Sequence, residues 1–254
     1  MVWATVPVTV WVQPASHPAH SSAAMVRVLA CVPIWDTIGH RPRNLNAMRS
    51  DLPQGPDSPP TDELRSAELS LGVLHQVIRL IATDDLGKQT PCREFDVAEL
   101  TEHLVRSTAV LGGAAGAEMP ERDPSDSVER QVILAARSAL DVWHRRGIDG
   151  AVDVGGVTMP ATVLVGVLSL EFLVHAWDYA TAIGRTVPAP DSLSEYVFGM
   201  TEKLLTPQGR KQAGFDDPIE VPDDAPPLQR LLAFTGRRAE VKTGSGRSAG
   251  RAAP

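Results

Sequence analysis

Cysteine is scarce in this chain of 254 residues, which contains only Cys31 and Cys92. Two cysteines so far apart cannot build the disulfide framework that stabilises many small secreted domains. The sequence also lacks a Cys-x-x-Cys pair, a glycine-rich phosphate-binding loop and a nucleophile elbow. We therefore expect a reduced, cytoplasmic protein whose chemistry rests on none of these motifs.

Positive charge is not in surplus either. The chain carries 24 Lys and Arg residues against 31 Asp and Glu, which gives a net charge of −7. Proteins that bind nucleic acids or anionic membranes are normally basic, so we expect neither partner. No uninterrupted apolar run reaches the ~18–20 residues that a membrane-spanning helix needs. The hydrophobic fraction of 43% is nevertheless sufficient for a folded core.

The two ends of the chain lack the periodic apolar pattern of folded elements. The first 26 residues contain no Lys, Arg, Asp or Glu, so the positive start of a secretory signal is missing. We predict that residues 1–60 are a disordered extension, with Met48 as an alternative start of the protein. Residues 241–254 are predicted to be a disordered tail. The folded domain is then residues 61–240.

Between these ends, apolar residues recur at helical spacing. Asp96 followed by Glu99 forms a capping box, and Pro160 suits the first position of a helix. Residues 151–159 read as a hairpin or extended loop, and we expect substrate specificity in this loop and in residues 209–226. The predicted helices are 62–83, 97–110, 128–146, 160–183, 192–205 and 228–234. This pattern predicts an all-α protein, a four-helix bundle with a short C-terminal capping helix.

One predicted helix, residues 160–183, is apolar nearly all round but is interrupted by polar residues. Glu171 and His175 are an i, i+4 pair on one side of this helix, and Asp178 continues the column. His103, on the second helix, is a third candidate ligand. Two imidazoles and one carboxylate suit zinc and leave a fourth position for water or substrate. Asp178 is a candidate to orient a ligand imidazole through its second ring nitrogen.

A metal-free alternative remains open at this point, because Glu171 and His175 can also pair with each other on the helix. Outside this group, His75 and His144 are expected to be packed or surface residues. Cys92 lies in a loop before a helix start, and we expect it to be a packing residue rather than a reactive thiol.

Several short motifs, in this order and at these separations, resemble the DinB-like superfamily. Within it, the chain is most similar to the mycothiol-dependent maleylpyruvate isomerase metal-binding family, in a largely uncharacterised actinobacterial branch. The resemblance covers about residues 61–238 and implies a four-helix bundle with a metal held by His103, Glu171 and His175. The residues that carry it are Thr90-Pro91-Cys92, Phe95-Asp96-Val97, His103-Leu104-Val105, Glu171, His175-Ala176-Trp177-Asp178 and the tail VPDDAPPLQRLLAFTGR.

The resemblance also implies chemistry with a small thiol, mycothiol in actinobacteria, as cosubstrate. A divalent metal, zinc being the expected one, can deprotonate such a thiol for attack on an electrophile. We expect a thiol S-transferase; the alternatives are a maleylpyruvate-type cis-trans isomerase and a non-catalytic metal-binding sensor or interaction module. The isomerase has an additional C-terminal domain, whereas this chain has only a short closing helix. No catalytic acid or base is predicted.

Overall fold

The computed structural model describes residues 55, 57–207, 210 and 215–238. The predicted tail and residues 1–54 of the predicted extension lie outside the described residues. Within the described part the chain is mostly helical, as predicted, and its one sheet has two strands.

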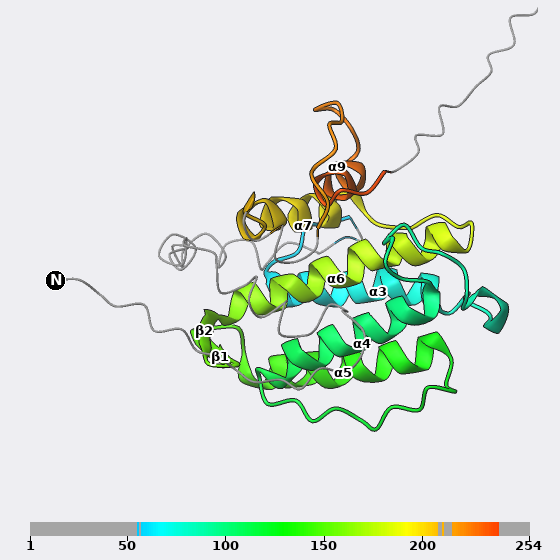
Figure 1. Cartoon of the computed structure of the whole chain (residues 1–254). Helices are drawn as coiled ribbons and strands as arrows, with labels where there is room; N and C mark the ends of the chain where they lie inside the picture. The colour runs from blue at the N-terminus through cyan, green and yellow to red at the C-terminus, as the bar shows by residue number, and fades with distance from the viewer. Residues whose placement is uncertain (1–54, 56, 208–209, 211–214, 239–254) are drawn as a thin grey trace, which may run out of the picture.

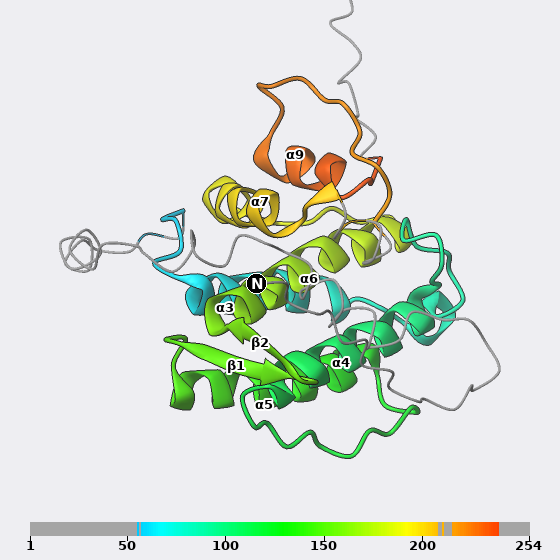
Figure 2. The same cartoon turned by 60° about the vertical axis from the view of Figure 1, so that its left-hand side comes forward.

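Four long helices enclose a shared apolar core: α3 (Glu63–Ile78), α4 (Val97–Gly113), α5 (Val128–Arg146) and α6 (Ala161–Ala182). Each of the four packs against two others, α3 and α4 each contacting both α5 and α6. Two further helices, α7 (Asp191–Leu204) and α9 (Pro227–Phe234), pack against each other, and α7 also contacts α3 and α6. Figures 1 and 2 show α3 and α6 between the α4–α5 pair and the α7–α9 pair.

Side-chain caps set the starts of three of these helices. Asp62 accepts a hydrogen bond from the Arg65 amide at 2.8 Å at the start of α3. The predicted capping box is confirmed at α4, where Asp96 accepts from the Glu99 amide at 2.8 Å and Glu99 accepts from the Asp96 amide at 3.0 Å. Ser127 caps α5 at 3.2 Å. Because each cap satisfies an amide that has no partner inside its helix, local sequence determines these starts.

The predicted end of the first helix was wrong. Helix α3 ends at Ile78 rather than near residue 83, and a short 3₁₀ turn, Thr83–Asp85, follows. The Asp85 carboxylate accepts a hydrogen bond from the Ala82 amide at 2.9 Å, so this side chain competes with helix continuation. The second helix was predicted to end at Val110 but continues to Gly113.

A β-hairpin precedes α6 directly. Strand β1 (Ala151–Val154) pairs antiparallel with β2 (Val157–Pro160), which confirms the hairpin alternative, and the turn between the strands is Gly155-Gly156. Both glycines have positive φ, 62° and 87°, which side chains other than glycine rarely adopt. Figure 2 shows the hairpin at the end of the structure where α6 begins.

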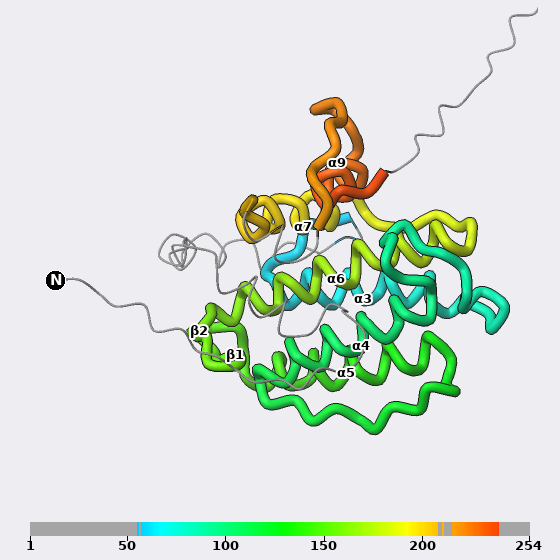
Figure 3. The backbone as a smooth tube through the Cα atoms, viewed as in Figure 1, coloured from blue at the N-terminus to red at the C-terminus, as the bar shows by residue number. Residues whose placement is uncertain are grey.

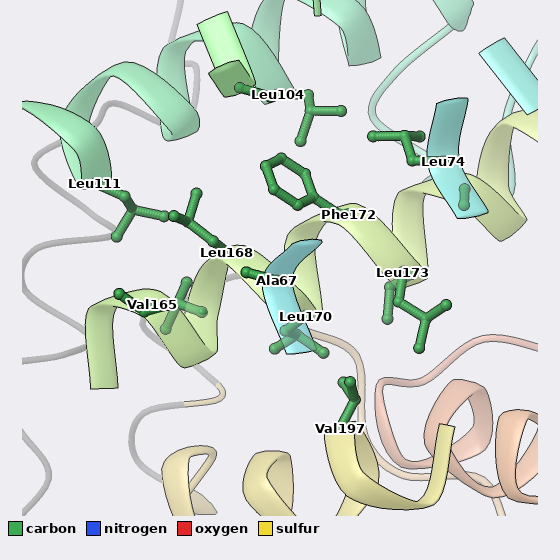
Figure 4. Packing of buried hydrophobic residues seen from close by; sticks show 14 of the residues in the cluster. Ala67, Leu74, Leu104, Leu111, Val165, Leu168, Leu170, Phe172, Leu173 and Val197 are labelled. Atoms are coloured by element: carbon green, nitrogen blue, oxygen red, sulfur yellow. The ribbon is translucent and has the colours of Figure 1, made fainter. Parts of the chain in front are cut away.

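Helix α6 is the centre of the packing, with 18 of its 22 residues buried. Its side chains Phe172 and Leu168 lie against Leu104 and Leu111 of α4 (Figure 4). By length and hydropathy α6 is the one helix among the described residues that is able to cross a membrane, but 89% of its apolar window is buried inside the protein. A helix covered on all sides is apolar on all sides, which explains its composition.

The α7–α9 pair closes the face of α6 that α4 leaves uncovered. Phe198 of α7 and Phe234 of α9 meet edge to face with ring centroids 5.8 Å apart. The tube in Figure 3 shows the chain leaving the end of α6, returning through α7 and then reaching α9, so that the last described residues come back toward α6.

The close approach of α4 and α5 depends on Gly112, which generates a testable prediction. A Cβ atom at this position would lie 2.7 Å from the Cβ and 2.9 Å from the Cα of Ala139. We expect Gly112→Ala to lower the free energy of unfolding by about 1–3 kcal/mol through overpacking. Urea denaturation measures the change.

The matched control is Gly113→Ala, in the next residue of the same helix. Its added Cβ has no neighbour within 4 Å, so the higher helix propensity of Ala should leave the stability unchanged or raise it. Equal effects of the two substitutions would contradict the packing argument.

Candidate metal centre

The structure brings the three predicted ligands together. Glu171 and His175 extend from α6 toward His103 of α4, and one ligand atom from each of the three lies within 4.8 Å of the other two. The Nε2 atom of His103 is 3.3 Å from Oε2 of Glu171, and Nε2 of His175 is 3.5 Å from the same oxygen. Two distant parts of the sequence therefore meet around one carboxylate oxygen.

A buried hydrogen bond holds α4 and α6 in the register that this meeting requires. Thr101, two residues before His103, lies 2.9 Å from the hydroxyl of Tyr179, which follows the ligands on α6. The Thr101 hydroxyl donates to the Val97 carbonyl at 2.8 Å. Its proton is therefore engaged, and the Tyr179 hydroxyl is the donor between the helices.

The geometry around Glu171 fits a set of ligands. Its Oε2 atom is buried and has no hydrogen-bond partner among the described residues, although two imidazole nitrogens face it. Two ligands that each lie about 2.0–2.1 Å from a tetrahedral ion are about 3.3–3.4 Å apart. The distances of 3.3 and 3.5 Å match that separation. The two imidazole contacts leave this buried oxygen without a well-formed hydrogen bond, and a divalent cation would satisfy it.

The carboxylate is in the charged form that binds a cation. Burial on its own raises the pKa of Glu171, but the two neighbouring imidazoles outweigh burial and hold this pKa well below its usual range. For His175, burial lowers the pKa, whereas its contacts with Asp178 and Glu171 raise it and prevail. Glu171 thus provides a negative charge at the point where the three ligand atoms meet.

Asp178 has the orienting contact predicted for it. Its Oδ2 atom lies 2.9 Å from Nδ1 of His175. In the neutral ring, a proton on Nδ1 donates to this carboxylate and leaves the Nε2 lone pair directed toward Glu171. Asp178 therefore selects the tautomer that a metal ligand needs.

Arg237 completes this network, and the sequence analysis missed it. Its Nε atom donates to Oδ1 of Asp178 at 2.9 Å and its Nη2 atom to Oδ2 at 2.8 Å. Burial raises the pKa of Asp178, but the charge and hydrogen bonds of Arg237 and His175 together outweigh burial, and the net shift is downward. The available signal was Asp178 itself, because a carboxylate on an apolar helix needs a cation and the closing segment carries one.

The site reaches solvent at one side. The side chain of His103 is 26% exposed, whereas those of Glu171 and His175 are 10% and 7% exposed. Phe95, in the loop before α4, lies beside His103 with ring centroids 5.0 Å apart. Of the three candidate ligands, His103 is therefore the one that lies nearest to solvent, next to the loop that precedes α4.

The hairpin, which is predicted to contribute to substrate specificity, lies away from the three candidate ligands. The hairpin packs at the start of α6, and Glu171 follows Ala161 by ten residues. At about 1.5 Å per residue this separates them by roughly 15 Å along the helix. The second predicted loop comes closer to the loop before α4, since Asp216 lies 3.8 Å from Arg93.

Cys92 lies in the loop before α4 but is not an activated thiol. Burial, followed by the negative charges of Asp178 and Glu171, raises the pKa of Cys92 to about 12. Its sulfur is therefore protonated at neutral pH and is a poor nucleophile. These properties agree with the packing role predicted for it.

The two remaining histidines in the described part of the chain are not ligands of this site. His75 pairs with Glu129 at 2.6 Å, and His144 pairs with Glu68 at 2.6 Å. Both pairs link α3 to α5 at exposed positions, so the structure agrees with the surface roles predicted for them.

The contact between Tyr179 and Thr101 predicts a measurable coupling. We expect Tyr179→Phe to lower the free energy of unfolding by about 0.5–1.5 kcal/mol, because the buried donor between α4 and α6 is lost. A double-mutant cycle with Thr101→Val isolates the pair in urea denaturation. Strictly additive effects of the two substitutions would contradict a direct hydrogen bond.

Comparison with known proteins found relatives without an assigned function. The chain is 27% identical over 184 residues to uncharacterised proteins from two strains of Mycobacterium tuberculosis. Each alignment covers 69% of this chain and 98% of the relative. No family model and no solved structure matches the chain.

Proposed function

We propose that this protein is a divalent-metal-dependent enzyme that uses a low-molecular-weight thiol of the mycothiol type, with thiol S-transfer as its reaction. The observation that carries the proposal is the oxygen of Glu171 that is buried without a hydrogen-bond partner in the described structure. Two imidazole nitrogens face this oxygen at the separation of neighbouring metal ligands. Ion pairs with His103 and His175 alone would satisfy this oxygen of Glu171 less well than a bound metal ion would.

The donor set favours zinc. Two neutral imidazoles and one carboxylate are ligands that zinc accepts at about 2.0–2.2 Å in catalytic sites. His103, Glu171 and His175 would hold the ion, and Asp178 would keep His175 in the required tautomer. Three protein ligands leave one tetrahedral position free, and the exposed edge of His103 provides access to it.

The DinB-like four-helix bundle is part of the same proposal. The closed arrangement of α3, α4, α5 and α6, each touching two of the others, supports it. So does the position of the ligands, one on the second of these helices and two on the fourth. The mycobacterial origin of the relatives supports mycothiol as the thiol, because actinobacteria contain it.

A bound divalent ion would supply one kind of chemistry, the lowering of the pKa of a thiol so that its sulfur can attack an electrophile. The chain's own residues bind and orient. The thiol of Cys92 remains protonated at neutral pH, so it does not compete as a nucleophile. The nucleophile is therefore expected to come from the cosubstrate.

Metal content tests the first half of the proposal. Protein purified without a histidine tag and reconstituted with zinc should hold about one zinc ion per chain, and His175→Ala should hold less than about a tenth of that. Metal analysis by mass spectrometry measures both. His144→Ala is the control, since His144 pairs with Glu68 away from the site. No zinc in either protein would leave only a metal-free bundle, and equal zinc in wild type and His175→Ala would place the ion outside this site.

Thiol consumption tests the second half. The zinc-loaded protein, incubated with mycothiol and a panel of electrophiles, should consume thiol faster than the uncatalysed reaction. His103→Ala should reduce the rate to background, because a ligand is lost, whereas His144→Ala should retain it. A substrate with a conjugated cis double bond, added to the panel, distinguishes isomerisation from S-transfer. Zinc binding without any rate above background would identify a non-catalytic metal-binding module.

A further inference from the structure

The buried ion pair between Asp178 and Arg237 joins the end of the described chain to the candidate metal centre. Asp178 has no exposed surface, and the side chain of Arg237 is 8% exposed. The two residues are 59 positions apart in sequence, yet the guanidinium contacts both carboxylate oxygens. Such a two-atom contact defines the orientation of the carboxylate as well as its charge.

The end of α9 holds Arg237 in place for this contact. The amide of Arg237 donates to the Leu232 carbonyl at 2.9 Å, and the amide of Gly236 donates to the Ala233 carbonyl at 3.0 Å. These two hydrogen bonds form the Schellman motif that commonly ends a helix, with glycine in the left-handed conformation. Gly236 has a φ of 81°, and a Cβ atom there would lie 2.5 Å from the Cβ of Asp216. A side chain at residue 236 would therefore displace the turn that directs Arg237.

We infer that Arg237 is a positioning residue of the metal centre and that docking of α9 and metal binding stabilise each other. The inference rests on the metal site of the proposed function. The connection runs from α9 through Arg237 to Asp178 and from Asp178 to Nδ1 of His175, whose Nε2 faces Glu171. No residue of α9 is itself a ligand.

The physical reason is the cost of a buried charge. Without Arg237, the buried carboxylate of Asp178 would lose the two-atom contact that fixes its orientation, and His175 would be its remaining partner. A carboxylate that is free to rotate is a weaker acceptor for the Nδ1 proton of His175. Because coupling between two binding events is reciprocal, an ion that needs an oriented His175 must also favour the docked position of α9.

The experiment compares three arginine variants in the full chain. Arg237→Met should raise the dissociation constant for zinc, measured by competition with a chelating dye, by about 10–100-fold. Arg237→Lys keeps the charge but not the two-atom contact, and it should restore only part of the affinity. Arg230→Met is the matched control. Arg230 lies on α9, stacks over Phe198 and pairs with Glu195 of α7, so it contributes to docking but does not contact Asp178.

Two further measurements separate positioning from general destabilisation. The visible absorption spectrum of bound cobalt(II) reports ligand geometry, and it should change in Arg237→Met but not in Arg230→Met. Zinc should slow hydrogen exchange of the amides of Thr235, Gly236 and Arg237 in the wild type, and this effect should be absent in Arg237→Met.

The outcomes distinguish this inference from the proposed function. If the wild type binds zinc, His175→Ala does not, and Arg237→Met retains wild-type affinity within about twofold, the metal site stands and the positioning role is overturned. If Arg230→Met weakens binding as much as Arg237→Met, docking alone matters and the inference is again overturned. If the wild type binds no zinc, both proposals are overturned. Should Arg237→Met fail to fold, the zinc affinity and cobalt spectrum of Arg237→Lys decide, and unchanged values overturn the inference.

Discussion

The compensation of two buried carboxylates on α6 is the constraint on which the rest of the site depends. Glu171 and Asp178 extend from a helix that other elements cover on nearly every side. A buried charge must be neutralised by a partner with good geometry, because the interior does not solvate it. Asp178 has Arg237 and His175 as partners, whereas one oxygen of Glu171 has only two imidazole nitrogens at ligand-like distances. This difference distinguishes the predicted orienting residue, Asp178, from the predicted metal ligand, Glu171.

The three-layer packing explains why these carboxylates can be buried at all. Helices α4 and α5 lie on one side of α3 and α6, and α7 and α9 lie on the other (Figure 1). The α4 layer contributes His103 to the site, and the closing segment after α9 contributes Arg237. The centre is therefore assembled from three separate parts of the chain, and none of them contains a complete site.

The same arrangement separates the candidate ligands on α6 from the end of the helix that the hairpin covers. The hairpin and the first turns of α6 contribute apolar contacts, with Met159 fully buried. The ligands lie in the second half of the helix, beside Phe95 and the loop before α4. The loop before α4 and the segment around Asp216 therefore lie on the side of the candidate ligands, whereas the hairpin lies at the other end of α6.

Much of this protein follows from its sequence alone. The capping box at Asp96 and the bounds of α5 depend on contacts within a few residues, and the i, i+4 spacing of Glu171 and His175 places both on one side of α6. Tertiary structure decided the features that depend on distant contacts. These are the meeting of His103 with Glu171 and His175, the close approach of α4 to α5 at Gly112, and the contact of Arg237 with Asp178. Local hydrogen bonds and helical periodicity depend on residues that are close together in the sequence. The partner of a buried charge is determined by how whole helices pack, and sequence spacing does not contain that information.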